Sequence, residues 1–202
     1  MSEDKRGVPG DGHRSLDLLP AIDLHAGAVV RLLRGDFDQA TAYPGDPVEI
    51  ATGFVRSGAR WLHVVDLDGA RDPGTRQVAQ IQAVVAGVGT AARVEVAGGL
   101  RDEASVAAML GAGAARVVMG TAALQDPALV RRLVGRHGPD RVAVALDVRS
   151  GQAIGHGWSE QSTASLFRLQ EEDECLVHHR ERRDIVHNAA VPMVHLHDSS
   201  CR

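Results

Sequence analysis

Two aspartates at the ends of short apolar runs are the residues best placed to do chemistry. Asp23 ends the run of residues 18–22, and Asp147 ends the run of residues 142–146. Apolar runs of this length suit strands buried on both faces of a parallel sheet, and reacting groups gather where such strands end. Two carboxylates at one rim can share proton transfer, because a partly desolvated acid keeps its proton while an ionised one accepts. Either aspartate alone could instead cap a helix or brace a loop.

Two short segments with glycine follow neighbouring strands and could bind an anion. Gly98-Gly99 comes after one strand and Gly120-Thr121 after the next, each just before a helix. Glycine lets backbone N–H groups approach a phosphate closely, and the Thr121 hydroxyl adds a donor. The alternative is that the glycines only permit tight turns between strand and helix. Because two such segments stand in register, we predict a phosphate cradle.

Other polar groups point to no metal site. Asp66 and Asp68 could bind a metal, but no third ligand follows at a suitable spacing, so we predict that they brace a loop. Residues near the C-terminus could suggest zinc, namely Cys175, His178, His179, His195 and His197. Their spacing fits no established zinc pattern, so we expect neither a metal nor a cofactor. Trp158 could stack on a flat substrate ring or cover the rim of a barrel.

The elements that must position these groups alternate between strand and helix. Apolar runs predict strands over residues 18–24, 61–66, 93–97, 116–119 and 141–147. Caps and apolar stripes predict helices that begin near residues 47, 78, 103 and 127. Residues 28–33 suggest a short extension or hairpin, and polar residues 36–41 suggest a loop, as do residues 69–74. The alternation predicts an α/β fold with a parallel sheet and right-handed crossovers.

Length and composition exclude several classes of protein. The chain of 202 residues is long enough for one domain, and its net charge of −4 without a basic stripe argues against nucleic-acid binding. No apolar run approaches the roughly 18 residues that would span a bilayer, so we expect no membrane partner. We expect residues 1–15 to be a disordered leader without the apolar core of a secretory signal, and the protein to be cytoplasmic.

The composition changes near residue 160. All 22 glycines lie at or before Gly157, and both cysteines lie after it. An acidic run at residues 171–174 and a basic run at residues 180–183 follow, without a clean apolar stripe. We therefore predict a leader at residues 1–15, an α/β portion at residues 16–160 and an atypical tail at residues 161–202.

Short motifs stand in a characteristic order between residues 17 and 160. They are Leu18-Leu19-Pro20-Ala21-Ile22-Asp23, Val30-Arg31-Leu32, His63-Val64-Val65-Asp66-Leu67, Gly98-Gly99-Leu100-Arg101, Gly120-Thr121-Ala122-Ala123-Leu124, Leu146-Asp147 and Gly157-Trp158. In this order they resemble the phosphoribosylformimino-5-aminoimidazole carboxamide ribotide isomerase family of histidine biosynthesis, and most closely its actinobacterial form, phosphoribosyl isomerase A. The resemblance implies a (βα)₈ TIM barrel and a cofactor-free Amadori rearrangement of an aminoaldose to an aminoketose. Some members also isomerise phosphoribosylanthranilate, which leaves a second substrate open.

The resemblance also implies roles for individual residues. Asp23 matches the proton acceptor of the family, and Asp147 matches its proton donor. The other matched positions contact the substrate or its phosphate, and they are Arg31, Gly98, Gly99, Gly120, Thr121 and Trp158. The implied partner is a small phosphoribosyl substrate.

The chain departs from this family after residue 160. A complete member continues with further strand–helix units, an Asp-Gly-Thr segment and a second pair of glycine-ended strands for a second phosphate. This sequence contains neither that segment nor any glycine after Gly157. Five strands leave an eight-stranded barrel open, so we expect an incomplete barrel, weak or no activity and self-association through the open edges. The alternative function is a non-catalytic half-barrel remnant that binds at most one phosphate group.

Overall fold

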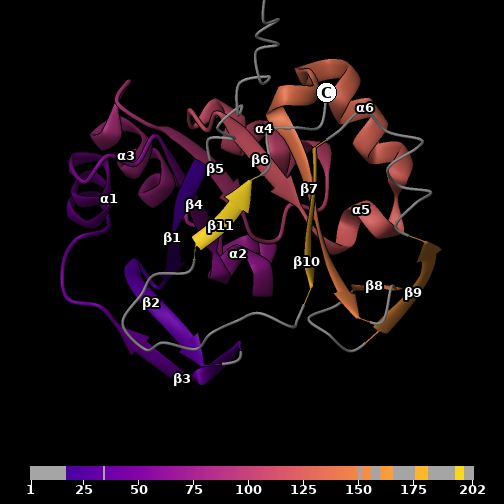
Figure 1. The fold of residues 1–202 in the computed structure, drawn as a ribbon, viewed down its shortest axis with the longest axis horizontal. Helices are drawn as coiled ribbons and strands as arrows, with labels where there is room; N and C mark the ends of the chain where they lie inside the picture. Colours follow the sequence, from indigo (N-terminus) through magenta and orange to yellow (C-terminus); the bar gives the residue numbers. More distant parts are fainter. Residues whose placement is uncertain are drawn as a thin grey trace, which may run out of the picture.

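A computed structural model describes residues 17–33, 35–149, 152–155, 160–165, 176–181 and 194–197 (Figure 1). The strands are β1 (Asp17–His25), β2 (Ala28–Leu33), β3 (Asp36–Ala42), β4 (Trp61–Asp66), β5 (Arg93–Ala97), β6 (Arg116–Met119), β7 (Val142–Arg149), β8 (Gln152–Gly155), β9 (Glu160–Ser165), β10 (Leu176–Glu181) and β11 (Val194–His197). The α-helices are α1 (Pro47–Arg56), α2 (Leu67–Arg71), α3 (Val78–Val88), α4 (Glu103–Gly111), α5 (Thr121–Gln125) and α6 (Pro127–His137). Two short 3₁₀ helices are η1 (Pro73–Thr75) and η2 (Pro139–Arg141).

Parallel strands form the centre of the sheet. Their order is β1-β4-β5-β6-β7, and each pairs in parallel with the next. Antiparallel ribbons flank this series, with β2 and β3 beside β1 and β8 and β9 beside β7. The described strands therefore form an open sheet, and the predicted α/β fold with an incomplete barrel of parallel strands is confirmed. Five of these strands lie in the predicted α/β portion, and β10 of the predicted tail adds a sixth beside β7.

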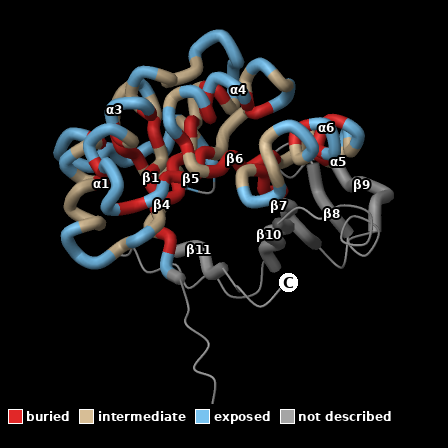
Figure 2. Tube along the Cα trace, turned by 90° about the horizontal axis from the view of Figure 1, so that it is seen from above, coloured by how far each residue is buried: buried red, intermediate tan, exposed pale blue. Residues whose placement is uncertain are grey.

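The helices cover one face of the sheet, and the apolar core lies between the two layers. Figure 2 shows the buried positions concentrated along the strands, with the helices outside them. Because side chains alternate along a strand, every second residue faces the helices. These outer-face residues are fully buried and include Ile22, Leu62, Val64, Val96 and Met119. The opposite face, which we call the inner face, is turned away from the helices and carries several polar groups.

Three of the four helices predicted from the sequence begin at an aspartate, namely α1, α4 and α6. Each aspartate carboxylate accepts a hydrogen bond from a backbone N–H of the first turn, from Val48 for Asp46 (2.8 Å), from Ser105 for Asp102 (2.7 Å) and from Leu129 for Asp126 (3.0 Å). These caps satisfy N–H groups that have no partner within the helix. Within the described part of the chain, no helix is both long enough and apolar enough to cross a membrane.

Three short elements depart from the sequence-based prediction. Residues 36–42 form β3 rather than a loop, pairing with β2, and the Phe37 ring packs edge-on against His25 at 5.3 Å between centroids. A two-stranded ribbon exposes both of its faces, so a polar sequence can form it. The segment after β4 contains α2, and α5 precedes α6; each of these helices has 5 residues, too few to show a helical period.

Strands from the predicted tail pair with both outer strands of the parallel series. β10 lies parallel to β7, and β11 lies antiparallel to the first half of β1, whose second half pairs with β2. This pairing satisfies backbone groups of edges that would otherwise be open. Self-association through those edges and the segment boundaries at residues 16 and 161 stay predictions, and the leader at residues 1–15 lies outside the described residues.

Candidate active site

Asp23 lies near the C-terminal end of β1 and alternates with the outer-face residues Ile22 and Leu24. Its side chain is half-buried. Burial raises the pKa of Asp23 above its ordinary value of 3.8, and attraction to Arg31 and His63 opposes this rise. A carboxylate with a raised pKa is a stronger base than a solvated aspartate, and a nearby cation keeps it ionised. Arg31 and Asp23, both predicted site residues, are therefore neighbours.

The two predicted catalytic aspartates lie on strands that run in the same direction. Asp147 is near the C-terminal end of β7, which points toward the end of the molecule where the β2–β3 hairpin lies (Figure 1). Four strand steps separate β1 from β7, which is roughly 19 Å along a flat sheet and less across a curved one. The side chain of Asp147 and the whole of Trp158 lie outside the described residues, so the pairing of Asp23 with Asp147 stays a prediction.

Gly98 and Gly99 are dictated by close packing against the segment that follows β4. Their φ angles are +109° and +63°. A Cβ on Gly98 would lie 2.2 Å from the carbonyl oxygen of Asp66, and one on Gly99 would lie 1.8 Å from that of Gly69. Any side chain at either position would therefore force the turn away from α2. The turn geometry explains these glycines, and their predicted contact with phosphate stays a prediction.

Gly120 and Thr121 form a different kind of turn. Gly120 precedes α5, and Thr121 is the first residue of that helix. A Cβ on Gly120 would meet only the Ala145 carbonyl oxygen, at the ordinary contact distance of 3.9 Å. Packing among the described residues therefore does not demand a residue without a side chain here. Close approach of a ligand would be one reason for a glycine at this position.

Asp66 and Asp68 brace the loop after β4, as predicted. The buried Asp66 carboxylate accepts hydrogen bonds from the N–H groups of Gly69 (2.8 Å) and Gln77 (2.9 Å). Asp68 accepts from the side-chain amide of Gln77 at 2.7 Å and lies 2.5 Å from Nδ1 of His25. In the part of the chain that the structure describes, no group of three or more His, Cys, Asp or Glu residues could hold a metal ion.

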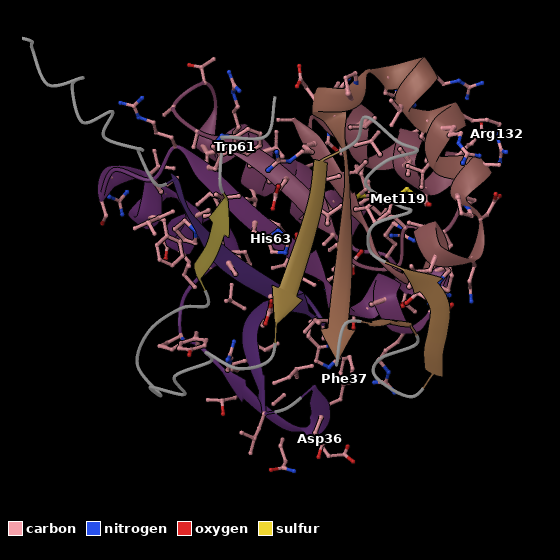
Figure 3. All side chains as sticks on the ribbon, turned by 45° about the vertical axis from the view of Figure 1, so that its right-hand side comes forward. Asp36, Phe37, Trp61, His63, Met119 and Arg132 are labelled. Atoms are coloured by element: carbon pink, nitrogen blue, oxygen red, sulfur yellow. The ribbon has the colours of Figure 1, made fainter. Side chains whose placement is uncertain are left out.

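A buried ionic cluster on the inner face was not predicted. Nδ1 of His63 lies 2.6 Å from one carboxylate oxygen of Glu95, and Nε of Arg116 donates to the other at 2.8 Å. These side chains come from β4, β5 and β6, whose register places the three residues side by side. Figure 3 shows His63 in the interior, with Trp61 nearer one end of the strands. The Arg116 guanidinium also lies 4.5 Å from the centre of the Trp61 ring.

The charge of Glu95 is fixed by this cluster. Burial would raise the pKa of Glu95, but the hydrogen bond from His63 and the charges of His63 and Arg116 lower it to about 2. Glu95 is 2% exposed, and His63 and Arg116 are each 6% exposed. Ionisable residues are almost never so buried without a partner. A glutamate inside the apolar run 93–97 was therefore a usable signal that the sequence-based reasoning missed.

Arg76 was also missed. Its guanidinium donates from one nitrogen to the carbonyl oxygen of Gly98 at 2.9 Å and from another to that of Gly99 at 2.8 Å. Arg101 adds a second connection between the same two segments, donating to the carbonyl oxygen of Ala70 at 2.6 Å. Sequence alone offers no signal for Arg76, because its partners are backbone carbonyls more than twenty residues away.

Known proteins similar to this chain agree with the resemblance inferred from the motifs. A family described as histidine biosynthesis protein matches residues 17–179. A relative from Thermomicrobium roseum is 48% identical over 154 residues, which are 76% of this chain and 62% of the relative. Relatives from Rhizorhabdus wittichii and Klebsiella pneumoniae are each 44% identical, over 77% and 76% of this chain and 63% and 64% of their own lengths. Each of the three is named 1-(5-phosphoribosyl)-5-((5-phosphoribosylamino)methylideneamino)imidazole-4-carboxamide isomerase.

The extent of these matches settles the family and the fold class. The chain spans less than two thirds of the length of the relatives named above. The family has the TIM-barrel fold, and the open parallel sheet described here is an incomplete barrel of that kind. The chain belongs to the histidine biosynthesis protein family.

Proposed function

We propose that this chain is an isomerase that converts an aminoaldose into an aminoketose, with Asp23 as the proton acceptor and Asp147 as the proton donor. The proposed substrate is phosphoribosylformimino-5-aminoimidazole carboxamide ribotide, the compound on which the names of the relatives say they act. The observation that carries the proposal is the half-buried carboxylate of Asp23 at the C-terminal end of a parallel strand, with its pKa raised by burial.

The proposed reaction consists of proton transfers. Asp147 donates a proton to the ring oxygen of the ribose, the bond from that oxygen to the anomeric carbon breaks, and the anomeric nitrogen supplies the electron pair of a Schiff base. Asp23 then removes the proton from the second carbon, and the electrons of that bond pass toward the Schiff-base nitrogen. The resulting enaminol tautomerises to the aminoketose. General acid–base chemistry accomplishes each step, so the proposal includes no metal and no cofactor.

The phosphate end of the substrate is proposed to bind at the turns that follow β5 and β6. Gly99 and Thr121 would offer N–H and hydroxyl donors, and Gly120 leaves room for a close approach. Arg31, whose charge acts on Asp23, would also attract the anionic substrate. Trp158 would stack on the imidazole ring.

Three further parts of the proposal rest on the sequence. Phosphoribosylanthranilate is also an aminoaldose, so the same acid and base would act on it as a second substrate. The proposed location is the cytoplasm. Self-association is proposed to run through sheet edges, of which β3 and β9 end the path of neighbouring strands.

Steady-state turnover of the bis-phosphorylated aminoimidazole substrate tests the proposal. Asp23→Asn and Asp147→Asn are each expected to lower kcat by about 10²–10⁴-fold, the usual contribution of a positioned acid or base. Asp38→Asn is a matched control, because Asp38 is exposed on β3. A folded chain without turnover that still binds phosphate would refute the isomerase and support the non-catalytic remnant instead.

A further inference from the structure

The turn after β5 is held from one side by a forked side chain. Arg76 uses its planar guanidinium to donate to the carbonyls of two successive residues, Gly98 and Gly99. A fork of fixed geometry orients two acceptors at once, which a single-point cation cannot do. Both glycines have positive φ angles, and glycine adopts positive and negative φ about equally, so its own preference does not fix this conformation. The fork, together with the close packing against Asp66 and Gly69, therefore holds the peptide planes in place.

The two N–H groups of these peptide planes point the other way. In a trans peptide the N–H lies opposite the carbonyl, and the structure has no cis peptide bonds among its described residues. Carbonyls directed at Arg76 therefore turn the N–H groups of Gly99 and Leu100 away from it. Neither N–H has a hydrogen-bond acceptor in the described part of the chain, although Leu100 is only 3% exposed. Gly99 is half-buried and Leu100 is buried, and an N–H group of a buried residue that lacks an acceptor is rare and costly.

We propose that Arg76 is a positioning residue for the phosphate-binding turn, holding the carbonyls of Gly98 and Gly99 so that the N–H groups of Gly99 and Leu100 are presented to a phosphate. This rests on the proposed function, since it specifies how one part of the phosphate cradle is built. Arg76 itself lies on the carbonyl side of the turn and does not touch the phosphate.

The segment that carries Arg76 is held in place by its neighbours. Gln77, the next residue, donates its backbone N–H to the buried Asp66 carboxylate at 2.9 Å. Gly69, on the same segment, is so close that an added Cβ would lie 3.1 Å from an Arg76 guanidinium nitrogen. Contacts with α2 and the residues beside it thus fix the position of the Arg76 guanidinium. The guanidinium in turn fixes the position of the turn after β5.

A titration with inorganic phosphate, followed by amide chemical shifts of Gly99 and Leu100, tests the role of Arg76. Wild type is expected to show saturable shifts at both amides. Arg76→Met is expected to weaken phosphate binding by about tenfold, the effect of losing a well-placed hydrogen bond, at a temperature where both chains are fully folded. Arg71→Met is the control. Arg71 lies over the Phe37 ring at 4.4 Å, so this substitution removes a guanidinium from the same segment without changing a contact to the turn.

Arg76→Lys separates positioning from simple attraction. It keeps the positive charge and loses the fork, so its phosphate affinity is expected to fall close to that of Arg76→Met. Wild-type affinity in Arg76→Lys, or equal affinity in Arg76→Met and wild type, would overturn the positioning role and leave the proposed function intact. If the wild type shows no phosphate-dependent shifts at Gly99 and Leu100, both the positioning role of Arg76 and this phosphate site are wrong. Absence of turnover with these shifts intact would count against the isomerase alone.

Discussion

The two faces of the parallel sheet differ in what they bury. On the outer face Leu62 and Val64 are fully buried in an apolar layer beneath the helices. On the inner face the same sheet buries the carboxylate of Glu95, paired to His63 and Arg116, and carries Asp23 near the rim. Successive side chains of a strand point to opposite faces, so an apolar residue of the core and an ionisable residue of the inner face can be neighbours in the sequence. Substitutions on the two faces should therefore have effects of different kinds.

The largest effect on stability is expected from breaking the inner cluster. Glu95→Gln removes the only negative charge of the cluster and leaves Arg116 buried without a counter-charge, which costs about 3–5 kcal/mol of unfolding free energy. Urea denaturation measures this loss. A change below about 1 kcal/mol, typical of an exposed ion pair, would show that the cluster on the inner face is solvated.

The buried Glu95 carboxylate should also make the stability of the protein depend on pH. The pKa of Glu95 is about 2 in the folded chain, below its ordinary value of 4.5, so its contribution is fully present above 4.5 and is lost as pH falls toward 2. Unfolding free energy measured between pH 6 and 3 should therefore fall more steeply for wild type than for Glu95→Gln. Parallel curves for the two chains would contradict the assignment.

On the outer face, Leu62→Ala is expected to cost about 2–5 kcal/mol, because Leu62 is 0% exposed and its removal leaves a cavity. Its neighbour His63 lies on the other face, so the dependence of stability on pH should stay that of wild type. Denaturation at two pH values checks both statements together. A Leu62→Ala chain that loses the acid dependence would show that the two faces are coupled.

The smallest effect is expected at the surface. Glu103 pairs with Arg132 at 3.0 Å and with Arg136 at 2.8 Å, but these side chains are 36%, 54% and 63% exposed. Glu103→Gln should therefore change the unfolding free energy by less than about 1 kcal/mol, and added salt should reduce the difference further. If Glu103→Gln lowered the unfolding free energy as much as Glu95→Gln does, burial would not explain why the inner cluster contributes so much to stability.

The sequence predicted elements that repeat a pattern and missed those that depend on distant partners. Strands β4 to β7 and the caps at Asp46, Asp102 and Asp126 follow from periodicity and local hydrogen bonding, and each is present. The polar strand β3 was read as a loop, because its stability comes from pairing with β2 rather than from its own composition. The partners of Glu95 come from the parallel register of β4, β5 and β6. The forked contact of Arg76 joins two loop segments that lie 22 and 23 residues apart in the sequence.

For the site, too, the sequence predicted individual residues but not their contacts with distant parts of the chain. Asp23 and Arg31 were both named from the sequence, and their electrostatic contact is a property of the folded β1–β2 hairpin. Gly98 and Gly99 were correctly placed at the end of a strand, but only coordinates show that the Asp66 and Gly69 carbonyls exclude a side chain there. The catalytic pairing of Asp23 with Asp147 stays a prediction.

The most direct test of the account compares two titrations of Asp23. Carbon NMR of the labelled carboxyl gives its pKa in the folded chain, and the acidic limb of kcat/KM against pH gives the pKa of the essential base. We predict that the carboxyl titrates above its ordinary value of 3.8, that the two pKa values coincide, and that Asp23→Asn abolishes the limb together with most of the rate. A carboxyl that titrates at or below 3.8, or a limb that persists unchanged in Asp23→Asn, would contradict the assignment of Asp23 as the base.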